Sequence, residues 1–107
     1  MRRRPGFALT YAPEAIDHLD AIDLKHHRAL RRAIEEGLGW NPLEPTRNRK
    51  PLEQPAPFSA TWELRCGPMN RFRVFYEVDA VERTVSVLAI GVKVGSRLFV
   101  AGKEVAP

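Results

Sequence analysis

The chain has 107 residues, with 17 Lys and Arg against 13 Asp and Glu, which gives a formal net charge of +4. This length predicts one domain with a single core, spanning residues 1–107. A hydrophobic fraction of 44% excludes a disordered tail, and no apolar run approaches the roughly 18 residues of a membrane span. The basic N-terminal extension, residues 1–6, is not followed by the apolar stretch of a signal peptide. The single cysteine, Cys66, is typical of a reducing environment, so we expect a cytoplasmic protein.

The excess positive charge lies in one window. Residues 1–46 and 74–107 each carry equal numbers of basic and acidic side chains, whereas residues 47–73 carry six basic and two acidic ones. Of the 17 basic residues, 13 are Arg, whose guanidinium suits phosphate recognition. The window therefore predicts an anionic partner, with nucleic acid as the first hypothesis. The alternative is a solvated surface on a mildly basic protein.

The first third of the chain predicts a strand and a helical hairpin. Large apolar side chains alternate over residues 7–11, which indicates a short strand. A helix then begins at Pro13 and carries apolar residues at helical spacing as far as Ile22. Asp23 is a suitable N-cap for a second amphipathic helix, which ends at the glycines 37 and 39. The two helices are expected to cover one face of a sheet.

A proline-rich loop is predicted at residues 39–59. This segment holds five of the nine prolines and shows no apolar periodicity. It also carries a basic cluster, namely Arg47, Arg49 and Lys50. Connections of this length are uncommon in compact domains unless they are functional or disordered.

Three strands are predicted in the second half, at residues 60–66, 71–78 and 84–92. Their short connections indicate an antiparallel meander. The predicted fold class is therefore α+β, in the order β-α-α-β-β-β. A mainly antiparallel four-stranded sheet packs against the two-helix hairpin.

The period of two in these strands separates an apolar face from a basic one. If the apolar side chains face the helices, the opposite face carries Glu63, Arg65, Arg71 and Arg73. Lys93 at the end of the last strand and Arg97 just after it can join them. Such a face, beside a basic loop, predicts a cradle for a nucleic-acid backbone. The alternative is ordinary cross-strand pairing between Glu and Arg on an exposed face.

The sequence shows no pattern of metal or cofactor binding. The three histidines have no His or Cys partner at ligand spacing, and there is no glycine-rich phosphate-binding motif. Cys66 falls on the apolar side of its strand, which is typical of a small core residue. We therefore expect neither a metal nor a cofactor.

Residues 7–100 resemble the RelE/ParE family of toxins from bacterial type II toxin–antitoxin systems. Four segments carry the resemblance: Tyr11-Ala12-Pro13-Glu14-Ala15, Trp62-Glu63-Leu64-Arg65, Phe72-Arg73-Val74-Phe75-Tyr76-Glu77-Val78 and Val87-Leu88-Ala89-Ile90-Gly91-Val92-Lys93. The resemblance implies a microbial-RNase-like fold, a cognate antitoxin as partner and growth arrest by the free toxin. Its RelE-like branch implies metal-independent cleavage of mRNA on the ribosome, in which the 2′-hydroxyl attacks its own phosphate and leaves a 2′,3′-cyclic phosphate.

The resemblance also implies roles for individual residues. Arg73 and Arg65 match phosphate-binding positions of the family, and Lys93 stands where the family often has an arginine. Glu63 replaces a basic residue and is the candidate general base, because a guanidinium is a poor base. Phe99 stands about where RelE-like enzymes have a tyrosine that stacks on the nucleotide. The remaining expected RNA-binding residues are Arg47, Arg49, Lys50, Arg71 and Arg97.

The missing tyrosine keeps other functions open. One alternative is a ParE-like inhibitor of DNA gyrase, and another is a non-catalytic module that binds its antitoxin and regulates. In each case we expect an apolar groove beside the helical hairpin for the antitoxin. We also expect the C-terminal residues 99–107 to be flexible and displaced on binding.

Overall fold

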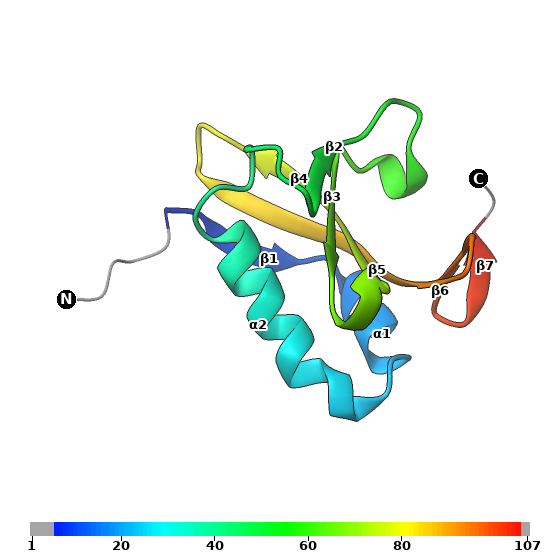
Figure 1. Cartoon of the computed structure of the whole chain (residues 1–107). Helices are drawn as coiled ribbons and strands as arrows, with labels where there is room; N and C mark the ends of the chain where they lie inside the picture. Colours follow the sequence, from blue (N-terminus) through cyan, green and yellow to red (C-terminus); the bar gives the residue numbers. More distant parts are fainter. Residues whose placement is uncertain (1–5, 106–107) are drawn as a thin grey trace.

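The computed structural model describes residues 6–105, so the predicted N-terminal extension lies outside the described residues except for Gly6. Two α-helices pack on one face of a twisted, mainly antiparallel sheet (Figure 1). The helices are α1 (Pro13–Asp20) and α2 (His27–Leu38). The strands are β1 (Ala8–Tyr11), β2 (Arg49–Pro51), β3 (Trp62–Cys66), β4 (Phe72–Asp79), β5 (Thr84–Val94), β6 (Arg97–Val100) and β7 (Lys103–Val105). The predicted α+β fold class is confirmed.

The strands are ordered β2-β3-β4-β5-β6-β7, and all these neighbours are antiparallel. The predicted meander of β3, β4 and β5 is confirmed. β1 pairs in parallel with the first part of β5, from Thr84 to Val87. β6 pairs with the same edge of β5 further along, from Val92 to Val94. The free edge of β5 between them is closed by α1, where Nδ1 of His18 lies 3.3 Å from the backbone nitrogen of Ile90 and accepts its hydrogen bond.

The helical hairpin begins and ends close to the predicted positions. Pro13 occupies the first turn of α1, where its missing N–H costs no hydrogen bond. The side chain of Asp23 accepts a hydrogen bond from the backbone N–H of Lys25, as expected of a cap, but the turn it caps is a 3₁₀-helix at Leu24–His26 that leads into α2. Gly39 follows the last residue of α2.

The main core lies between the helices and the sheet. It joins Leu30, Ile34 and Leu38 of α2 to the apolar side chains of β3 and β4, among them Leu64 and Val74, as the period of two predicts. A smaller cluster of Ala60, Phe75 and Ala89 lies apart from this core, and Leu52 and Leu98 pack against it. Because Phe75 is directly opposite Glu63 in the sheet, this cluster covers part of the face that carries the charged residues.

Three short strands extend the sheet beyond the four that were predicted. β2 forms inside the predicted proline-rich loop, and β6 and β7 form a hairpin in the segment that was expected to be flexible. Residues 106–107 lie outside the described residues. These three strands have three or four residues each and no clear alternation of large apolar and polar side chains, so their formation depends on the neighbouring strand rather than on their own pattern.

Candidate nucleic-acid-binding site

A compact group of charged side chains lies on the sheet face away from α2. We call it the Glu63 cluster, formed by Lys50, Glu63, Arg65 and Arg73. Lys50 is opposite Glu63 in the β2–β3 pair, and Arg65 is directly opposite Arg73 in the β3–β4 pair. The predicted shared face of Glu63, Arg65 and Arg73 is therefore confirmed.

One carboxylate oxygen is shared by all three cations of the cluster. Oε1 of Glu63 lies 3.4 Å from Nε of Arg65, 3.8 Å from Nη1 of Arg73 and 3.9 Å from Nζ of Lys50. The Glu63 side chain is only 10% exposed. Like charges directly opposite each other destabilise a sheet, and Glu63 offsets that cost for the two arginines. One negative and three positive side chains still leave a net positive surface.

Arg73 is the most enclosed cation of the cluster, with a side chain 13% exposed. Its Nε donates a hydrogen bond of 3.1 Å to the backbone oxygen of Asn70. Burial lowers the pKa of Arg73, Glu63 opposes this shift, and Arg65 lowers the pKa further. A largely buried guanidinium held in one orientation is suited to bind a phosphate oxygen.

A second basic feature adjoins the cluster at the end of the β3–β4 hairpin. This tip hollow has a volume of about 520 Å³ and is lined by Met69, Asn70, Arg71, Arg73, Val92, Lys93, Val94 and Gly95. The backbone N–H of Lys93 donates a hydrogen bond of 2.7 Å to the carbonyl of Arg71, which holds Arg71, just before β4, beside Lys93 of β5. Among the described residues that line the hollow there are three cations and no carboxylate.

Three of the predicted RNA-binding residues lie away from this face, namely Arg49, Arg97 and Phe99. Arg49 is opposite Leu64 and points toward the helices, where its guanidinium donates hydrogen bonds to the backbone carbonyls of Gly37 and Glu44. Its placement is that of a structural link between β2 and the end of α2. Arg47 is exposed in the loop before β2.

Phe99 and Arg97 are also outside the Glu63 cluster. Phe99 is opposite Val92, on the helix side of the sheet, and lines a small cavity with His18 and Ile22 of the hairpin. Arg97 lies over the Phe99 ring at 5.2 Å and forms a bidentate ion pair with Glu104. The structure therefore does not bring Phe99 to Arg65 and Arg73, because the alternation of β6 turns it to the other face of the sheet.

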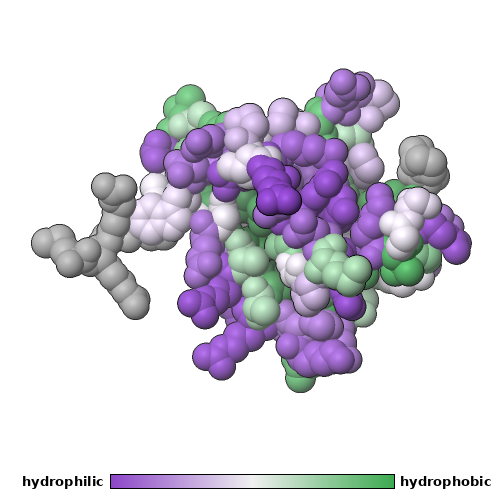
Figure 2. Space-filling view, viewed as in Figure 1, coloured by the Kyte–Doolittle hydropathy of each residue, from purple (hydrophilic) through white to green (hydrophobic). Residues whose placement is uncertain are grey.

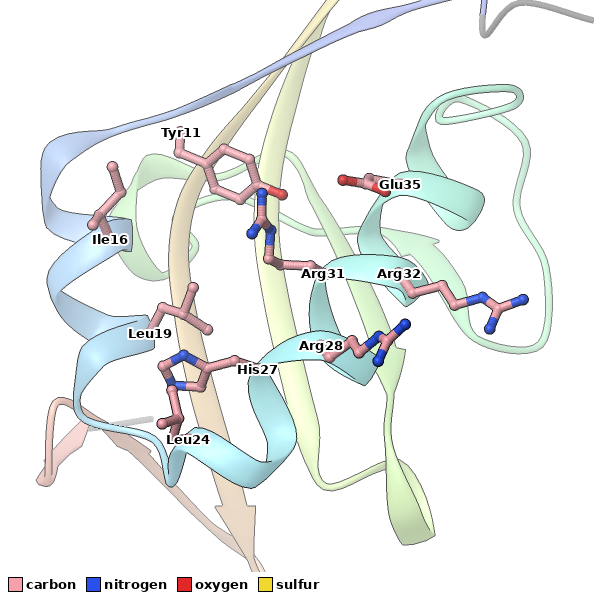
Figure 3. Close-up of a pocket in the computed structure, with 9 residues that line it drawn as sticks. All are labelled: Tyr11, Ile16, Leu19, Leu24, His27, Arg28, Arg31, Arg32 and Glu35. Atoms are coloured by element: carbon pink, nitrogen blue, oxygen red, sulfur yellow. The ribbon is translucent and has the colours of Figure 1, made fainter.

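A third feature lies on the helix side of the molecule. A groove of about 890 Å³ runs between the helices of the hairpin, and Figure 3 shows its lining residues: Tyr11, Ile16, Leu19, Leu24, His27, Arg28, Arg31, Arg32 and Glu35. We call it the helical groove. Apolar side chains of α1 and Leu24 form one wall, and the arginines of α2 form the other. A groove is therefore present beside the hairpin, but only one of its walls is apolar, whereas an apolar groove was predicted.

The view in Figure 2 shows a mostly hydrophilic surface on the side where α2 lies, with hydrophobic side chains in small separate areas between the polar ones. Within the helical groove, Ile16 is 50% exposed. Burial and the nearby Glu35 raise the pKa of Tyr11, whereas Arg31 lowers it. The phenol therefore stays neutral beside the arginines of the rim.

The cysteine and the potential metal ligands of the described residues form no further reactive site. Burial raises the pKa of the Cys66 thiol to about 11, so Cys66 is a protonated core residue rather than a nucleophile. Within residues 6–105, no three His, Cys, Asp or Glu side chains come together as a metal site. None of the helices in this part of the chain is long and apolar enough to cross a membrane.

No protein-family model matches the sequence, and a search of curated proteins finds no match either. Among solved structures, the chain is similar to a chain of the toxin–antitoxin complex RelBE2 from Mycobacterium tuberculosis, with a TM-score of 0.66 and 22% identity. The match covers 83% of this chain and 99% of the other. The two chains share a fold. The fold implied by the RelE/ParE resemblance is thus confirmed.

Sequence reasoning missed two groups of residues that the structure places at these features. Met69 and Asn70 line the tip hollow, and the arginines of α2 line the helical groove. A signal existed for the second group, because Arg28, Arg31, Arg32 and Glu35 recur at helical spacing. No comparable signal marks Met69, since a turn residue shows no periodicity.

Proposed function

We propose that this chain is the toxin of a type II toxin–antitoxin pair, located in the cytoplasm, and that it arrests growth by cleaving mRNA on the ribosome. The observation that carries the proposal is the pair of guanidiniums, Arg65 and Arg73, set side by side on one sheet face. They occur in a fold shared with a chain of a toxin–antitoxin complex. Two directly opposed arginines repel each other, and the sheet needs the buried Glu63 to offset that repulsion; departures of this kind from ordinary strand pairing are typical of functional sites.

In this proposal the cations bind the scissile phosphate. Arg65 and Arg73 hold its non-bridging oxygens, and Lys93 approaches from the adjacent strand. Their positive charge stabilises the pentavalent phosphate formed when the ribose 2′-hydroxyl attacks. The bond from phosphorus to the 5′-oxygen then breaks, and the 5′-oxygen takes a proton from water. The products are a 2′,3′-cyclic phosphate and a free 5′-hydroxyl. No metal or cofactor takes part in these steps.

Glu63 is the proposed general base for the 2′-hydroxyl. Its carboxylate already contacts the cations that hold the phosphate, so a ribose attached to that phosphate lies close to it. The substitution Glu63→Gln keeps the size of the side chain but removes the base. We expect Glu63→Gln to retain RNA binding and to lose cleavage by about 100-fold or more. Equal cleavage by Glu63→Gln and the wild type would assign Glu63 a purely positioning role.

The cognate antitoxin is the proposed occupant of the helical groove. The groove combines exposed apolar side chains, such as Ile16, with the arginines of α2. An amphipathic helix with acidic residues flanking its apolar stripe complements both. On this account the partner binds on the helix side, and the Glu63 cluster on the other side of the sheet acts on RNA.

The proposed function is tested by adding the purified protein to cell-free translation of a reporter and, in parallel, to a gyrase supercoiling reaction. We expect translation to stop and supercoiling to continue. Translation that continues at all protein concentrations would remove the ribosome as the target.

A ParE-like gyrase inhibitor is the second candidate function. The observation in its favour is that Phe99 lies on the helix side of the sheet, so the Glu63 cluster has no aromatic partner from β6 for stacking a nucleotide. A surface of this kind can bind a target without cutting RNA. Loss of supercoiling together with normal translation would establish this candidate and exclude the first.

A further inference from the structure

The tip of the β3–β4 hairpin presents an apolar side chain to open space. Met69 is 95% exposed and sits in a turn between Gly67 and Arg71. Met69 and Asn70 both have positive φ values, 56° and 53°, in the left-handed region that residues other than glycine rarely adopt. Gly67 also has a positive φ, and a Cβ there would collide with the Phe72 ring. The turn is therefore held in one strained conformation that displays Met69.

Met69 stands at the border of the tip hollow. The cations of the hollow are Arg71, Arg73 and Lys93, while Met69, Val92 and Val94 supply apolar surface. Asn70 is anchored to the neighbouring loop by a hydrogen bond of 3.3 Å from its side-chain nitrogen to Oδ1 of Asn48. The backbone oxygen of Asn70 accepts a hydrogen bond from Nε of Arg73, so the turn is linked to Arg73.

The composition of the hollow differs from that of the Glu63 cluster in one respect. Glu63 shares one oxygen among Lys50, Arg65 and Arg73, whereas no carboxylate lines the hollow in the described part of the chain. Arg73 also faces Glu63, so an incoming anion meets two cations of the hollow, Arg71 and Lys93, that form no ion pair with that carboxylate. A volume of about 520 Å³ lies in the range of small-ligand sites.

We propose that the tip hollow binds the nucleotide adjacent to the scissile phosphate in single-stranded RNA. Arg71 binds its phosphate, Lys93 lies between this phosphate and the scissile one and contacts both, and the base packs against Met69. A thioether is polarisable and makes favourable contacts with aromatic rings, and every base offers such a face. The contact is tolerant of sequence, so Met69 positions the strand rather than selecting a base. This inference rests on the proposed action on RNA and adds a binding subsite to it.

The test is fluorescence anisotropy of a labelled single-stranded RNA, measured over a range of salt concentrations. Three variants are compared with the wild type: Met69→Ala, Lys93→Ala and Val81→Ala. Val81→Ala is the matched control, because Val81 is an apolar residue, 90% exposed, in the β4–β5 turn at the other end of β4. The titration is repeated with an RNA that has the same length and the same sugar–phosphate backbone but carries abasic sites.

We expect Met69→Ala to weaken binding of the normal RNA about two- to tenfold and to leave binding of the abasic RNA unchanged. Lys93→Ala should lower the slope of log K against log salt by about 0.7, the value for one phosphate contact of a single strand. Val81→Ala should match the wild type in both titrations.

Two other outcomes overturn the inference in different ways. If the wild type binds RNA and Met69→Ala behaves like Val81→Ala, the hollow does not seat a nucleotide, while the proposed function stands. If the wild type neither binds RNA nor inhibits translation, the proposed function fails and the subsite fails with it. Urea denaturation of each variant, measured in parallel, identifies any loss of binding that follows from unfolding.

Discussion

Two arginine-rich surfaces lie on opposite sides of the same sheet, and they differ in what surrounds the arginines. In the Glu63 cluster, Arg65 and Arg73 are drawn toward one buried carboxylate. In the helical groove, Arg28 and Arg31 border exposed apolar side chains. The first arrangement holds guanidiniums in place for a small anion, and the second suits an amphipathic chain. A count of arginines therefore does not define a nucleic-acid site, whereas the neighbours of each arginine do.

The largest expected effect comes from removing one arginine from each surface and comparing the two variants in the same assays. Arg73→Ala removes the most enclosed guanidinium of the Glu63 cluster, and we expect it to raise the concentration for half-inhibition of translation about 100-fold or more. Arg28→Ala removes an arginine of the helical groove and should leave this concentration unchanged. Antitoxin binding, measured by calorimetry, should show the reverse pattern. Equal losses in both assays for both variants would show that the surfaces are not separate.

A somewhat smaller effect is expected from the apolar wall of the groove. Ile16→Asp places a charge where the antitoxin is proposed to bury an apolar side chain, and burial of an isoleucine contributes about 1.5–3 kcal/mol. We expect the dissociation constant of the antitoxin to rise about 10- to 100-fold, with inhibition of translation unchanged. Val81→Asp, at an exposed position in the β4–β5 turn, is the control. Unaltered antitoxin affinity of Ile16→Asp would move the docking site away from the hairpin.

A residue between the two surfaces tests whether loss of stability alone can imitate these effects. The buried hydroxyl of Tyr76 donates a hydrogen bond of 2.7 Å to the carbonyl of Pro42, and burial raises the pKa of this phenol. Tyr76→Phe leaves that carbonyl without its donor and should lower the free energy of unfolding by about 1–3 kcal/mol. Urea denaturation measures this change. Both the antitoxin affinity and the inhibition of translation should remain those of the wild type at 25 °C.

The smallest expected effect is a pH dependence of stability that belongs to neither surface. Burial lowers the pKa of His18, while Asp17 and Glu14 raise it, and neutral Nδ1 accepts the N–H of Ile90. The unfolded state therefore binds more protons, so this stabilisation is present above the ordinary pKa of 6.5 and is lost as the pH falls through the lowered value. The difference in melting temperature between wild type and His18→Ala should shrink from pH 8 to pH 5. A difference in melting temperature that stays constant over this pH range would show that folding does not change the pKa of His18.

The central elements of the fold were predictable because each one is long enough to show its period. The apolar positions of α2 and the alternation around Leu64 and Val74 correctly identified which side chains face the core. The shared face of Glu63, Arg65 and Arg73 followed from the same alternation. What these residues do stays a prediction, because a side chain's position does not reveal its substrate.

The C-terminal hairpin was missed although its turns carry a signal. Gly95-Ser96 separates Val94 from its partner Arg97, and Ala101-Gly102 separates Val100 from Lys103. Two-residue turns with glycine are typical of tight hairpins. Recognition of these turns gives the register of β6, and that register places Phe99 on the helix side. The role of Arg49 was not predictable in the same way, because it depends on carbonyls of residues distant in the sequence.

The most direct test of the account maps the ends of an mRNA after translation with the purified protein. We expect new ends within the translated region, carrying a 2′,3′-cyclic phosphate, only when ribosomes are present. Arg73→Ala should produce about 100-fold fewer of these ends, and addition of the antitoxin should abolish them. Intact mRNA in reactions that contain active ribosomes and the wild-type protein would contradict the claim that this face of the sheet cleaves RNA.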